Sequence, residues 1–364
     1  MTKILFVSGD IGEGTGGAGT AILELSKSIV KKGLASVDVL TFGMSELNAR
    51  KLTTELGINV YSDKLIRLHR SFYLSRRFLF NMKFFKSYDH IIINGIYQFL
   101  DLFFIFRSMF IKRAIYIFPH GTIDPFLIER SRKKKAFLYI YAFLLRWANV
   151  KFIALTNYES STLQSYLKID QSDILVVPNG ISEEFRACSM KRINTVTPKL
   201  IYLGRFHPKK NIESTILAVK SLATSIPLEL RLYGPQNSYK RELEEKYASE
   251  NVIFMDAVYG ENKQKALLDA DIFILASHSE GLPMAVLEAI AIRIKVVVSA
   301  HCHIPFIDHD KLGVTTGTKP SEIQNSILKV MDQEDGFYEP FLNYYNWDRS
   351  ASKLLKYLTR QGFE

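Results

Sequence analysis

Two cations five residues apart, Arg205 and Lys210, stand in the segment Gly204–Asn211, where a short apolar run gives way to a polar loop. Arg205 offers a planar fork of N–H donors and Lys210 a mobile point charge, and both groups bind phosphate well. The apolar run Leu200–Leu203 precedes the loop and a helical pattern follows it, so we expect both cations between a strand and a helix. This arrangement suits a diphosphate. A surface loop with ordinary basic residues is the alternative, and the motif alone weighs the two about equally.

Two carboxylates follow a second apolar run, Ile272–Leu275. Glu280 comes shortly after this run and Glu288 eight residues later. Pro283 between them is typical of the first turn of a helix, so we expect Glu280 in a loop and Glu288 about two turns along a helix, facing a ligand. Carboxylates are strong acceptors for neighbouring hydroxyls, so one can hold a sugar and the other a ribose. An ordinary acid on a helix surface is the alternative for Glu288, and its apolar neighbours weaken that alternative.

A glycine-rich segment, Gly12–Gly17, matches G-x-G-x-x-G after an apolar run and before a helical pattern, which alone is typical of dinucleotide binding. That interpretation needs an acid at the end of the second strand to hold a ribose, but the acid of that strand, Asp38, stands at its start. Helical periodicity begins only near Thr20. We therefore interpret the segment as a glycine-rich loop at a helix N-terminus that can approach a phosphate or sugar, with NAD binding as the minor alternative.

Strand-like and helix-like segments alternate along the whole chain, which predicts parallel sheets with right-handed crossovers. A length of 364 residues exceeds one core of ordinary size, and the polar stretch Ser189–Pro198 interrupts the alternation like an interdomain linker. We predict two Rossmann-like, doubly wound α/β domains facing each other across a cleft, at residues 1–185 and 195–345, with a C-terminal helix at 346–364 packing back onto the first. The predicted strands are Ile4–Ser8, Val37–Phe42, His90–Asn94, Ala114–Phe118, Phe152–Leu155, Ile174–Val177, Leu200–Leu203, Leu228–Tyr233, Val252–Met255, Ile272–Leu275 and Val296–Ser299.

Taken together and in order, these motifs resemble those of the retaining GT-B glycosyltransferases of family 4, and the resemblance spans nearly the whole chain. Glu280 and Glu288 match the family's Glu-x7-Glu element. Gly204, Arg205 and Lys210 match its Gly-Arg-x4-Lys phosphate loop. Further elements match one by one, although Tyr233 replaces a residue that is usually small: Gly16–Gly17, His120–Gly121, Pro178–Ile181, Tyr233–Pro235 and Asn346–Asp348.

The resemblance implies a role for each matched residue. Arg205 and Lys210 bind the donor diphosphate and stabilise the charge that grows on the leaving nucleotide. Glu288 holds the ribose, Glu280 holds hydroxyls of the transferred sugar, and His120 touches the sugar near the reacting carbon. No nucleophile is evident in the first domain, which fits a same-face mechanism in which the departing phosphate helps to deprotonate the acceptor. The donor-binding residues implied are Gly16, Gly17, Gly204, Arg205, Lys210, Glu280, Gly281, Leu282, Pro283 and Glu288.

We expect no metal and no cofactor, because the nucleotide sugar is a substrate. The run His301–His303 has ligand-type residues, but adjacent side chains of an extended segment point to opposite faces. By resemblance to a comparable loop of the family, the run forms part of the donor-site wall. Two cysteines, Cys188 and Cys302, provide no disulfide framework and fit a reducing compartment. The N-terminus resembles a first strand rather than a signal peptide, so we expect a cytoplasmic protein.

The excess positive charge lies in the first half of the chain. Residues 1–180 hold 24 Lys/Arg and 14 Asp/Glu, a net of +10, whereas residues 181–364 hold 23 of each. Much of the charge lies at Lys64–Lys86 and Arg130–Lys151, interleaved with apolar residues, and we expect aromatic, basic helices near residues 72–86 and 133–148. An anionic membrane surface is the favoured partner, a solvated face the second interpretation, and nucleic acid a distant third because no nucleic-acid motif accompanies the charge.

No segment has the roughly 20 apolar residues needed to cross a bilayer. We therefore expect an enzyme that is peripheral on the inner face of the cytoplasmic membrane. It transfers a sugar from a UDP- or GDP-sugar to a hydroxyl of a lipid-linked or cell-surface glycan, as in bacterial polysaccharide or lipopolysaccharide assembly. A GT-B-fold sugar-nucleotide epimerase and a non-catalytic, membrane-associated scaffold are the alternatives. The basic surface in the acceptor half disfavours the epimerase, and the complete set of donor residues disfavours the scaffold.

Overall fold

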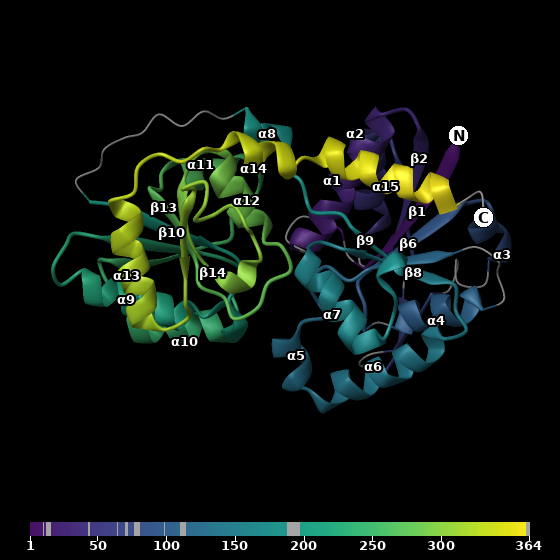
Figure 1. The fold of residues 1–364 in the computed structure, drawn as a ribbon, viewed down its shortest axis with the longest axis horizontal. Coiled ribbons are helices and arrows are strands. Elements are labelled where there is room, and N and C mark those ends of the chain that lie inside the picture. The colour runs from purple at the N-terminus through teal and green to yellow at the C-terminus, as the bar shows by residue number, and fades with distance from the viewer. Residues whose placement is uncertain are drawn as a thin grey trace. The chain divides into compact units, whose positions relative to one another are not determined.

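A computed structural model of the chain describes residues 1–9, 11, 16–42, 44–63, 65–69, 72–75, 81–97, 99–109, 114–187 and 197–361. The chain divides into two compact units (Figure 1). Unit 1 comprises Met1–Gly180 and Asn346–Glu364, and unit 2 comprises Ile181–Tyr345. Residues 188–196, on which most of the expected linker falls, lie outside the described part of the chain.

Unit 1 is built on a seven-stranded sheet in the order β3-β2-β1-β6-β7-β8-β9, and every neighbouring pair is parallel. The order runs in opposite directions on either side of β1, so a topological switch point lies between β1 and β6. The strands are β1 (Thr2–Ser8), β2 (Ala35–Thr41), β3 (Asn59–Ser62), β6 (His90–Asn94), β7 (Ile115–Phe118), β8 (Val150–Ala154) and β9 (Ile174–Val176).

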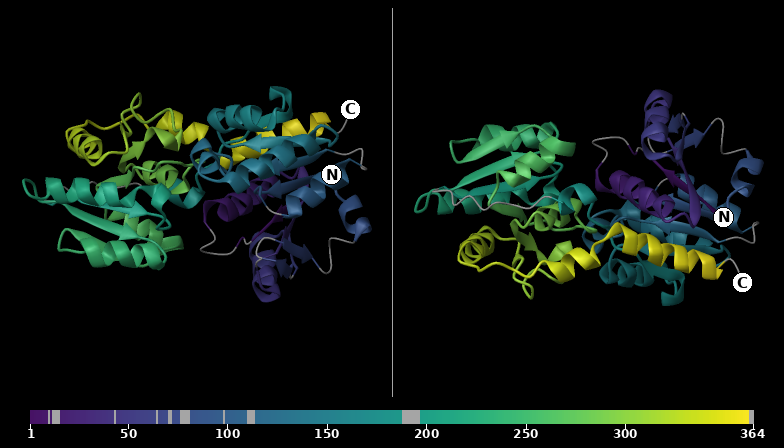
Figure 2. Two further views of the ribbon diagram at one scale, coloured as in Figure 1. Left: turned by 90° about the horizontal axis from the view of Figure 1, so that it is seen from below. Right: turned by 90° about the horizontal axis from the view of Figure 1, so that it is seen from above.

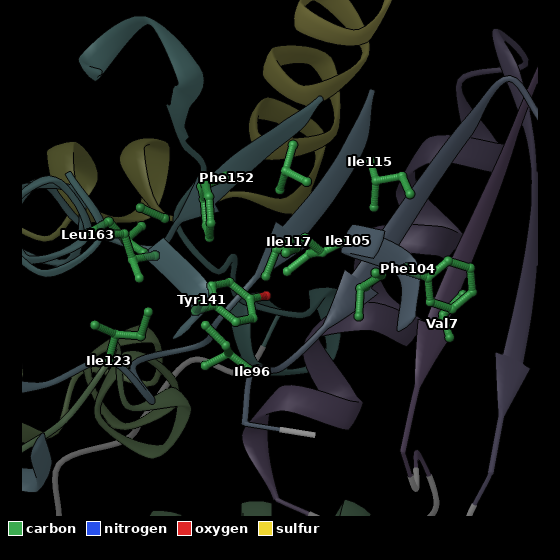
Figure 3. Close-up of a cluster of buried hydrophobic side chains, with 14 of the residues drawn as sticks. Val7, Ile96, Phe104, Ile105, Ile115, Ile117, Ile123, Tyr141, Phe152 and Leu163 are labelled. Carbon is green, nitrogen blue, oxygen red and sulfur yellow. The ribbon is translucent and has the colours of Figure 1, made fainter. Parts of the chain in front are cut away.

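Helices connect these strands and cover the sheet (Figures 1 and 2). The central strands read as continuous apolar runs because a parallel sheet is buried on both faces. Figure 3 shows one of the resulting cores, in which Phe104, Tyr141 and Leu163 from three helices pack with strand residues such as Ile117 and Phe152. The helices are α1 (Gly17–Lys31), α2 (Glu46–Leu56), α3 (Met82–Lys86), α4 (Phe99–Ser108), α5 (Pro125–Glu129), α6 (Arg132–Leu145), α7 (Asn157–Leu167) and η1 (Gln171–Asp173).

The last helix, α15 (Trp347–Gln361), belongs to unit 1 although it follows unit 2 in sequence. It packs along α1, as the yellow and purple helices in Figure 1 show. Ser28 Oγ of α1 donates to Asp348 at 2.5 Å, and Ser350 Oγ donates to the carbonyl of Pro178 at 2.7 Å. These polar contacts fix the register of a strongly amphipathic helix whose apolar side is buried.

Unit 2 repeats the architecture with a six-stranded parallel sheet in the order β12-β11-β10-β13-β14-β15. Its switch point lies between β10 and β13. The strands are β10 (Lys199–Leu203), β11 (Glu229–Tyr233), β12 (Val252–Met255), β13 (Ile272–Leu275), β14 (Lys295–Ser299) and β15 (Gly313–Thr316). The helices are α8 (Glu183–Arg186), η2 (Pro208–Lys210), α9 (Ile212–Leu222), α10 (Ser238–Tyr247), α11 (Gly260–Leu268), α12 (Met284–Ala291), η3 (Ala300–Cys302), α13 (Pro320–Met331) and α14 (Glu339–Tyr344).

The predicted fold class is confirmed, and one expected helix is wrong. The segment near residues 72–86 does not form one helix. Instead β4 (Leu65–His69) and β5 (Phe72–Ser75) pair as an antiparallel hairpin, and Met82–Lys86 form a short helix. Both strands are rich in aliphatic and aromatic residues, which favour a pleated conformation, and only two residues separate them. The side chains of residues 64–80 lie outside the described part of the chain.

Among the described residues, no helix has both the length and the apolar composition that a bilayer crossing requires.

Candidate donor site

The residues singled out in the second half of the chain gather at one edge of the unit 2 sheet. Strands β10 and β13 are neighbours, paired at Leu200 with Ile272, and the strand order reverses between them. In open parallel sheets, ligands bind beyond the carboxyl ends of the strands at such a switch point. The loops that leave β10 and β13 at this edge carry the two predicted cations and Glu280.

Close packing at two glycines holds the loop after β10 in place. A Cβ atom on Gly204 would lie 2.8 Å from the Tyr202 hydroxyl, which donates a 2.9 Å hydrogen bond to the carbonyl of Arg205. A Cβ atom on Gly234, in the next loop, would lie 2.1 Å from the carbonyl oxygen of Gly204. Both glycines are therefore needed because other atoms occupy the space of a side chain.

Lys210 and Glu280 form a buried ion pair at the centre of this edge. Lys210 Nζ lies 2.6 Å from Glu280 Oε1, and Ser277 Oγ donates to the same oxygen at 2.5 Å. Glu280 is 7% exposed. Burial raises the pKa of its carboxyl, but the charges of Lys210 and Lys209 and the two hydrogen bonds outweigh burial and lower the pKa below its usual value. Glu280 is thus ionised at neutral pH.

Asn211 ties three loops together at this edge. Its backbone is left-handed, with φ 54°, and its side-chain amide donates to the carbonyl of Ala276 at 3.1 Å and to that of Thr318 at 2.7 Å. The backbone N–H of His278 donates to the carbonyl of Lys209 at 2.8 Å. Asn211 was not among the predicted site residues. An Asn directly before a helical pattern is a common capping signal, and Asn211 does precede α9, but its side chain makes these loop contacts in place of a cap hydrogen bond.

Arg205 differs from Lys210 in its surroundings. Its side chain is exposed, and its guanidinium has no ion-pair partner among the residues that the structure describes. Of these two residues, Lys210 is already paired with a buried carboxylate and Arg205 is open to solvent. A diphosphate is a ligand that both could bind, because bidentate guanidinium and point-like ammonium contacts complement each other.

Helix α12 begins one residue after Pro283, so this proline precedes the helix rather than standing in its first turn. Glu288 lies little more than one turn into α12, closer to its start than the two turns expected. Its carboxylate is buried, at 5% exposure, and forms an ion pair with Lys263 of α11. The ammonium of Lys263 also lies 5.8 Å from the centre of the Phe185 ring. Gly281 and Leu282 occupy the loop between the two glutamates.

The run His301–His303 is not extended. The expectation that its adjacent side chains point to opposite faces of an extended segment is therefore wrong. Ala300–Cys302 form a single 3₁₀ turn and His303 has a left-handed backbone, with φ 54°. Cys302 is buried, and burial raises the pKa of its thiol. His301 is exposed. Within the described ranges, no group of three or more His, Cys, Asp or Glu side chains is arranged to hold a metal ion. Cys188 lies outside those ranges.

Gly16 and Gly17, two of the predicted donor-binding residues, lie in unit 1 at the start of α1. Gly16 caps this helix with φ 97°, a conformation that favours glycine, and Gly17 is its first residue. No atom of the described residues lies within 4 Å of the place where a Cβ of Gly16 would stand. The helix follows β1, so its N-terminus lies near the unit 1 switch point. Gly12–Thr15, the rest of the glycine-rich motif, lie outside the described residues.

His120 follows β7, also at the carboxyl edge of the unit 1 sheet. Its backbone is left-handed, with φ 52°, and its ring stacks on Phe118 with the ring centres 3.8 Å apart. Both ring nitrogens are buried, and neither has a hydrogen-bond partner among the described residues. Burial lowers the pKa of His120 to about 3, so the ring is neutral at physiological pH. A buried imidazole with two unused nitrogens is suited to a polar ligand.

Two family models match successive parts of the chain. The model described as Glycosyltransferase Family 4 matches residues 15–185, and the model described as Glycosyl transferases group 1 matches residues 189–343. The putative colanic acid biosynthesis glycosyltransferase WcaL of Salmonella typhimurium is 35% identical over 29% of this chain and 29% of its own length. A probable sucrose-phosphate synthase of Thermosipho melanesiensis is 26% identical over 52% of this chain and 48% of its own. The matches thus span at most about half the length of these curated relatives.

Solved structures share the fold over the full chain. The sucrose-phosphate synthase of Thermosynechococcus elongatus aligns with a TM-score of 0.76, 16% identity, and coverage of 100% of this chain and 99% of its own. The Anabaena protein HepE, crystallised with UDP and glucose, aligns with a TM-score of 0.78 and 16% identity over 99% of this chain and 100% of its own. The two parallel sheets, the family matches and these folds agree, and the chain belongs to the GT-B glycosyltransferases of family 4.

Proposed function

We propose that the protein transfers a sugar from a nucleoside diphosphate sugar to a hydroxyl of a lipid-linked or cell-surface glycan, with retention of anomeric configuration and without a metal or other cofactor. The observation that carries the donor half is the buried pair of Lys210 and Glu280, 2.6 Å apart at the switch point of unit 2. A cation and an ionised carboxylate side by side present one group for phosphate and one for sugar hydroxyls.

In this proposal the diphosphate binds Arg205 and Lys210, which stabilise the charge that develops as the glycosidic bond breaks. Glu288 accepts from the ribose hydroxyls, and Glu280 accepts from hydroxyls of the transferred sugar. His120 contacts the sugar near the reacting carbon; its neutral ring can accept a hydrogen bond from a hydroxyl. The departing phosphate deprotonates the acceptor on the same face, so the reaction needs no protein nucleophile.

The base of the nucleotide is uracil or guanine in this proposal. The Anabaena neighbour was crystallised with UDP and glucose, and the Staphylococcus aureus protein TarM was crystallised with UDP. UDP is therefore the first nucleotide to test, with GDP second.

A thermal-shift panel of UDP, GDP, ADP and their sugar conjugates tests the donor site. A ligand at 100 times its Kd stabilises the native state by about 2.7 kcal/mol, which a melting curve resolves. We expect one nucleotide to raise the Tm of the wild type and of Glu261→Ala, a change on the exposed side of α11, but not of Glu288→Ala. A panel in which no nucleotide acts, or only NAD does, contradicts the proposal. Nucleotide release that depends on an added glycan acceptor separates a transferase from an epimerase and from a scaffold.

The location at a membrane rests on an exposed apolar face of α6. Tyr139, Ile140, Phe143 and Trp147 are 78%, 56%, 54% and 59% exposed. Their positions lie along one side of a helix and its terminal turn, and the rings of Phe143 and Trp147 are in contact, with centres 4.6 Å apart. Such a side suits the boundary between lipid headgroups and acyl chains, where aromatic rings with a polar edge are favoured.

Exposed cations border this face, and acids are missing from it. Residues 130–151 contain no Asp or Glu. The exposed cations of α6 and of the turn that follows it are Arg132, Lys133, Lys135 and Arg146. Lys134 does not belong to this set, because its ammonium lies 5.1 Å from the centre of the Tyr97 ring and burial lowers its pKa. The combination fits an anionic membrane surface, and we assign the protein to the inner face of the cytoplasmic membrane.

Tryptophan fluorescence tests this location directly. The chain has two tryptophans, and Trp347 is only 6% exposed, so a spectral change on adding vesicles reports Trp147. With phosphatidylglycerol in phosphatidylcholine we expect a blue shift and quenching by brominated acyl chains, and neither with phosphatidylcholine alone. Lys133→Ser with Lys135→Ser should weaken binding, as should Phe143→Ser, whereas Leu328→Ser, an exposed apolar residue of α13 in unit 2, should not. Equal binding to neutral vesicles, or an unchanged spectrum, contradicts the assignment.

A further inference from the structure

The turn that carries His120 is held in an uncommon backbone conformation. It spans Pro119–Thr122, closed by a 3.3 Å hydrogen bond from the N–H of Thr122 to the carbonyl of Pro119. Both central residues are left-handed, with φ 52° at His120 and φ 72° at Gly121. Positive φ at both positions is the pattern of a type I′ turn, which favours glycine or asparagine. A histidine in this conformation persists where its surroundings hold it there, and such positions cluster at functional sites.

One carboxylate holds this turn. Glu159 Oε1 accepts the N–H of Gly121 at 2.6 Å, and its other oxygen, Oε2, accepts the N–H of Leu155 at 2.7 Å. Gly121 follows β7 and Leu155 follows β8, which are neighbouring strands, so the carboxylate bridges the ends of both. Glu159 lies in the first turn of α7 and is 3% exposed, and its own N–H is capped by Thr156 Oγ1 at 3.1 Å.

We propose that Glu159 is a positioning residue that fixes the His120 turn against the end of β8, so that the unpaired His120 ring is presented in one orientation. The proposal rests on the role of His120 in the proposed function. This role also explains why residue 159 is a glutamate and not a glutamine. Each carboxylate oxygen accepts one backbone N–H, whereas an amide has only one acceptor oxygen, so the side chain introduced by Glu159→Gln would turn its NH₂ group toward an N–H donor.

The two hydrogen bonds that Glu159 accepts also make the His120 turn sensitive to pH. Burial raises the pKa of Glu159 to about 7, against the opposing effect of its two backbone hydrogen bonds; the nearby carboxylate of Asp124 adds to the increase. Above this pH both oxygens accept. Below it a proton must occupy one of the two oxygens that face an N–H donor, and the bridge between β7 and β8 is weakened. His120 itself stays neutral across this range, because burial lowers its pKa to about 3.

The turn can be observed in isolation, because His120–Gly121 is the sole His–Gly pair in the sequence. Labelling histidine with ¹³C at the carbonyl and glycine with ¹⁵N gives a single amide signal in a carbonyl-filtered spectrum of the full chain. We expect that signal far downfield, as a short bond to a carboxylate requires, and expect it to titrate with a midpoint of about 7. In Glu159→Gln it should move upfield and stop titrating. Ser160→Ala, the adjacent buried residue of α7, should leave it unchanged.

Turnover then tests the consequence for His120, using hydrolytic release of the nucleoside diphosphate from whichever sugar nucleotide the thermal-shift panel selects. Glu159→Gln should lower kcat by up to about 100-fold, the effect of displacing a positioned group by roughly 1 Å, while the KM for the donor stays as in Ser160→Ala. The wild-type kcat should rise with pH through about 7, and that of the variant should not.

The outcomes distinguish a failure of the proposed function of His120 from a failure of the positioning role of Glu159. Full activity of His120→Ala contradicts the proposed function of His120, whatever the amide signal shows. Loss of activity in His120→Ala together with full activity in Glu159→Gln overturns the positioning role. A Gly121 amide signal that neither titrates in the wild type nor moves in Glu159→Gln also overturns the positioning role. If the variant fails to fold, the titration of the wild-type signal alone tests this role.

Discussion

Replacing Lys210 with methionine removes the cation from the buried pair and keeps the bulk of the side chain. Glu280, at 7% exposure, then loses both the charge 2.6 Å away and one hydrogen bond, and retains only that from Ser277. Removing one partner of a buried pair typically costs about 3–5 kcal/mol, because the other charge stays buried without compensation. We expect the stability of unit 2 to fall by about 3 kcal/mol at about pH 8.

The pH dependence of that loss follows from the pKa of Glu280. In the wild type the pKa is lowered, so the pair contributes stability above the unfolded value of about 4.5 and loses it as the pH falls through the folded value. Lys210→Met removes the largest effect that opposes burial, so the pKa of Glu280 should rise and the carboxyl should take up a proton more readily. The difference in stability between variant and wild type should therefore shrink as the pH falls from about 8 toward about 5.

The matched control is the exposed pair of Lys311 and Glu334, 3.0 Å apart with side chains 56% and 83% exposed. Lys311→Met should change the stability much less than Lys210→Met does, because solvent screens an exposed pair. Both tryptophans lie in unit 1, so urea unfolding is best followed by pulse-labelled hydrogen exchange of the peptides that cover β10 and β13. Glu280→Gln should restore part of the loss in the double variant. Equal costs at positions 210 and 311, or no change with pH, would refute the reasoning.

Three further predictions concern other parts of the structure. Gly234→Ala should destabilise unit 2 by about 1–3 kcal/mol, since its Cβ would meet the backbone oxygen of Gly204 at 2.1 Å, whereas Gly9→Ala, with no described atom within 4 Å, should be tolerated in thermal melts. The stability of unit 1 should fall by roughly 3 kcal/mol as the pH rises from 4.5 to about 8, because the folded state holds the proton of Glu159 up to a pKa of about 7. In Glu159→Gln, urea titrations should show no such dependence of stability on pH. Arg205→Lys should weaken nucleotide binding about tenfold or more by calorimetry at unchanged Tm, since it keeps the charge and loses the fork of donors; equal affinity would show that Arg205 is not a bidentate phosphate ligand.

The sequence predicted the fold because the physics of a buried parallel strand is local. His90–Asn94, Val252–Met255 and Ile272–Leu275 are apolar runs whose predicted bounds coincide with β6, β12 and β13. Their neighbours along the chain have helical spacing, so the alternation is visible without tertiary information. β3 and β15 were not predicted, because Asn59–Ser62 and Gly313–Thr316 are edge strands with few apolar residues.

Side-chain partners could not be predicted in the same way. The loop positions of Lys210 and Glu280 followed from motif spacing, but their contact depends on β10 and β13 being neighbours although 70 residues separate the two side chains. Lys263, which pairs with Glu288, belongs to no motif and has no local signal beyond its place on a helix. The same holds for Glu159, whose hydrogen bond to Gly121 spans 38 residues.

Glu159 and Glu280 show two ways of burying a carboxylate at the carboxyl edge of a parallel sheet. Ammonium groups compensate Glu280 and lower its pKa, so its charge costs little stability and remains at all physiological pH values. In the part of the chain that the structure describes, Glu159 has backbone N–H groups in place of a cation, and burial raises its pKa to about 7. The first arrangement suits a site that must offer a fixed charge to a polar ligand. The second arrangement couples the geometry of a turn to the proton concentration, because the ionised carboxylate accepts a backbone N–H on each of its two oxygens and the protonated form does not.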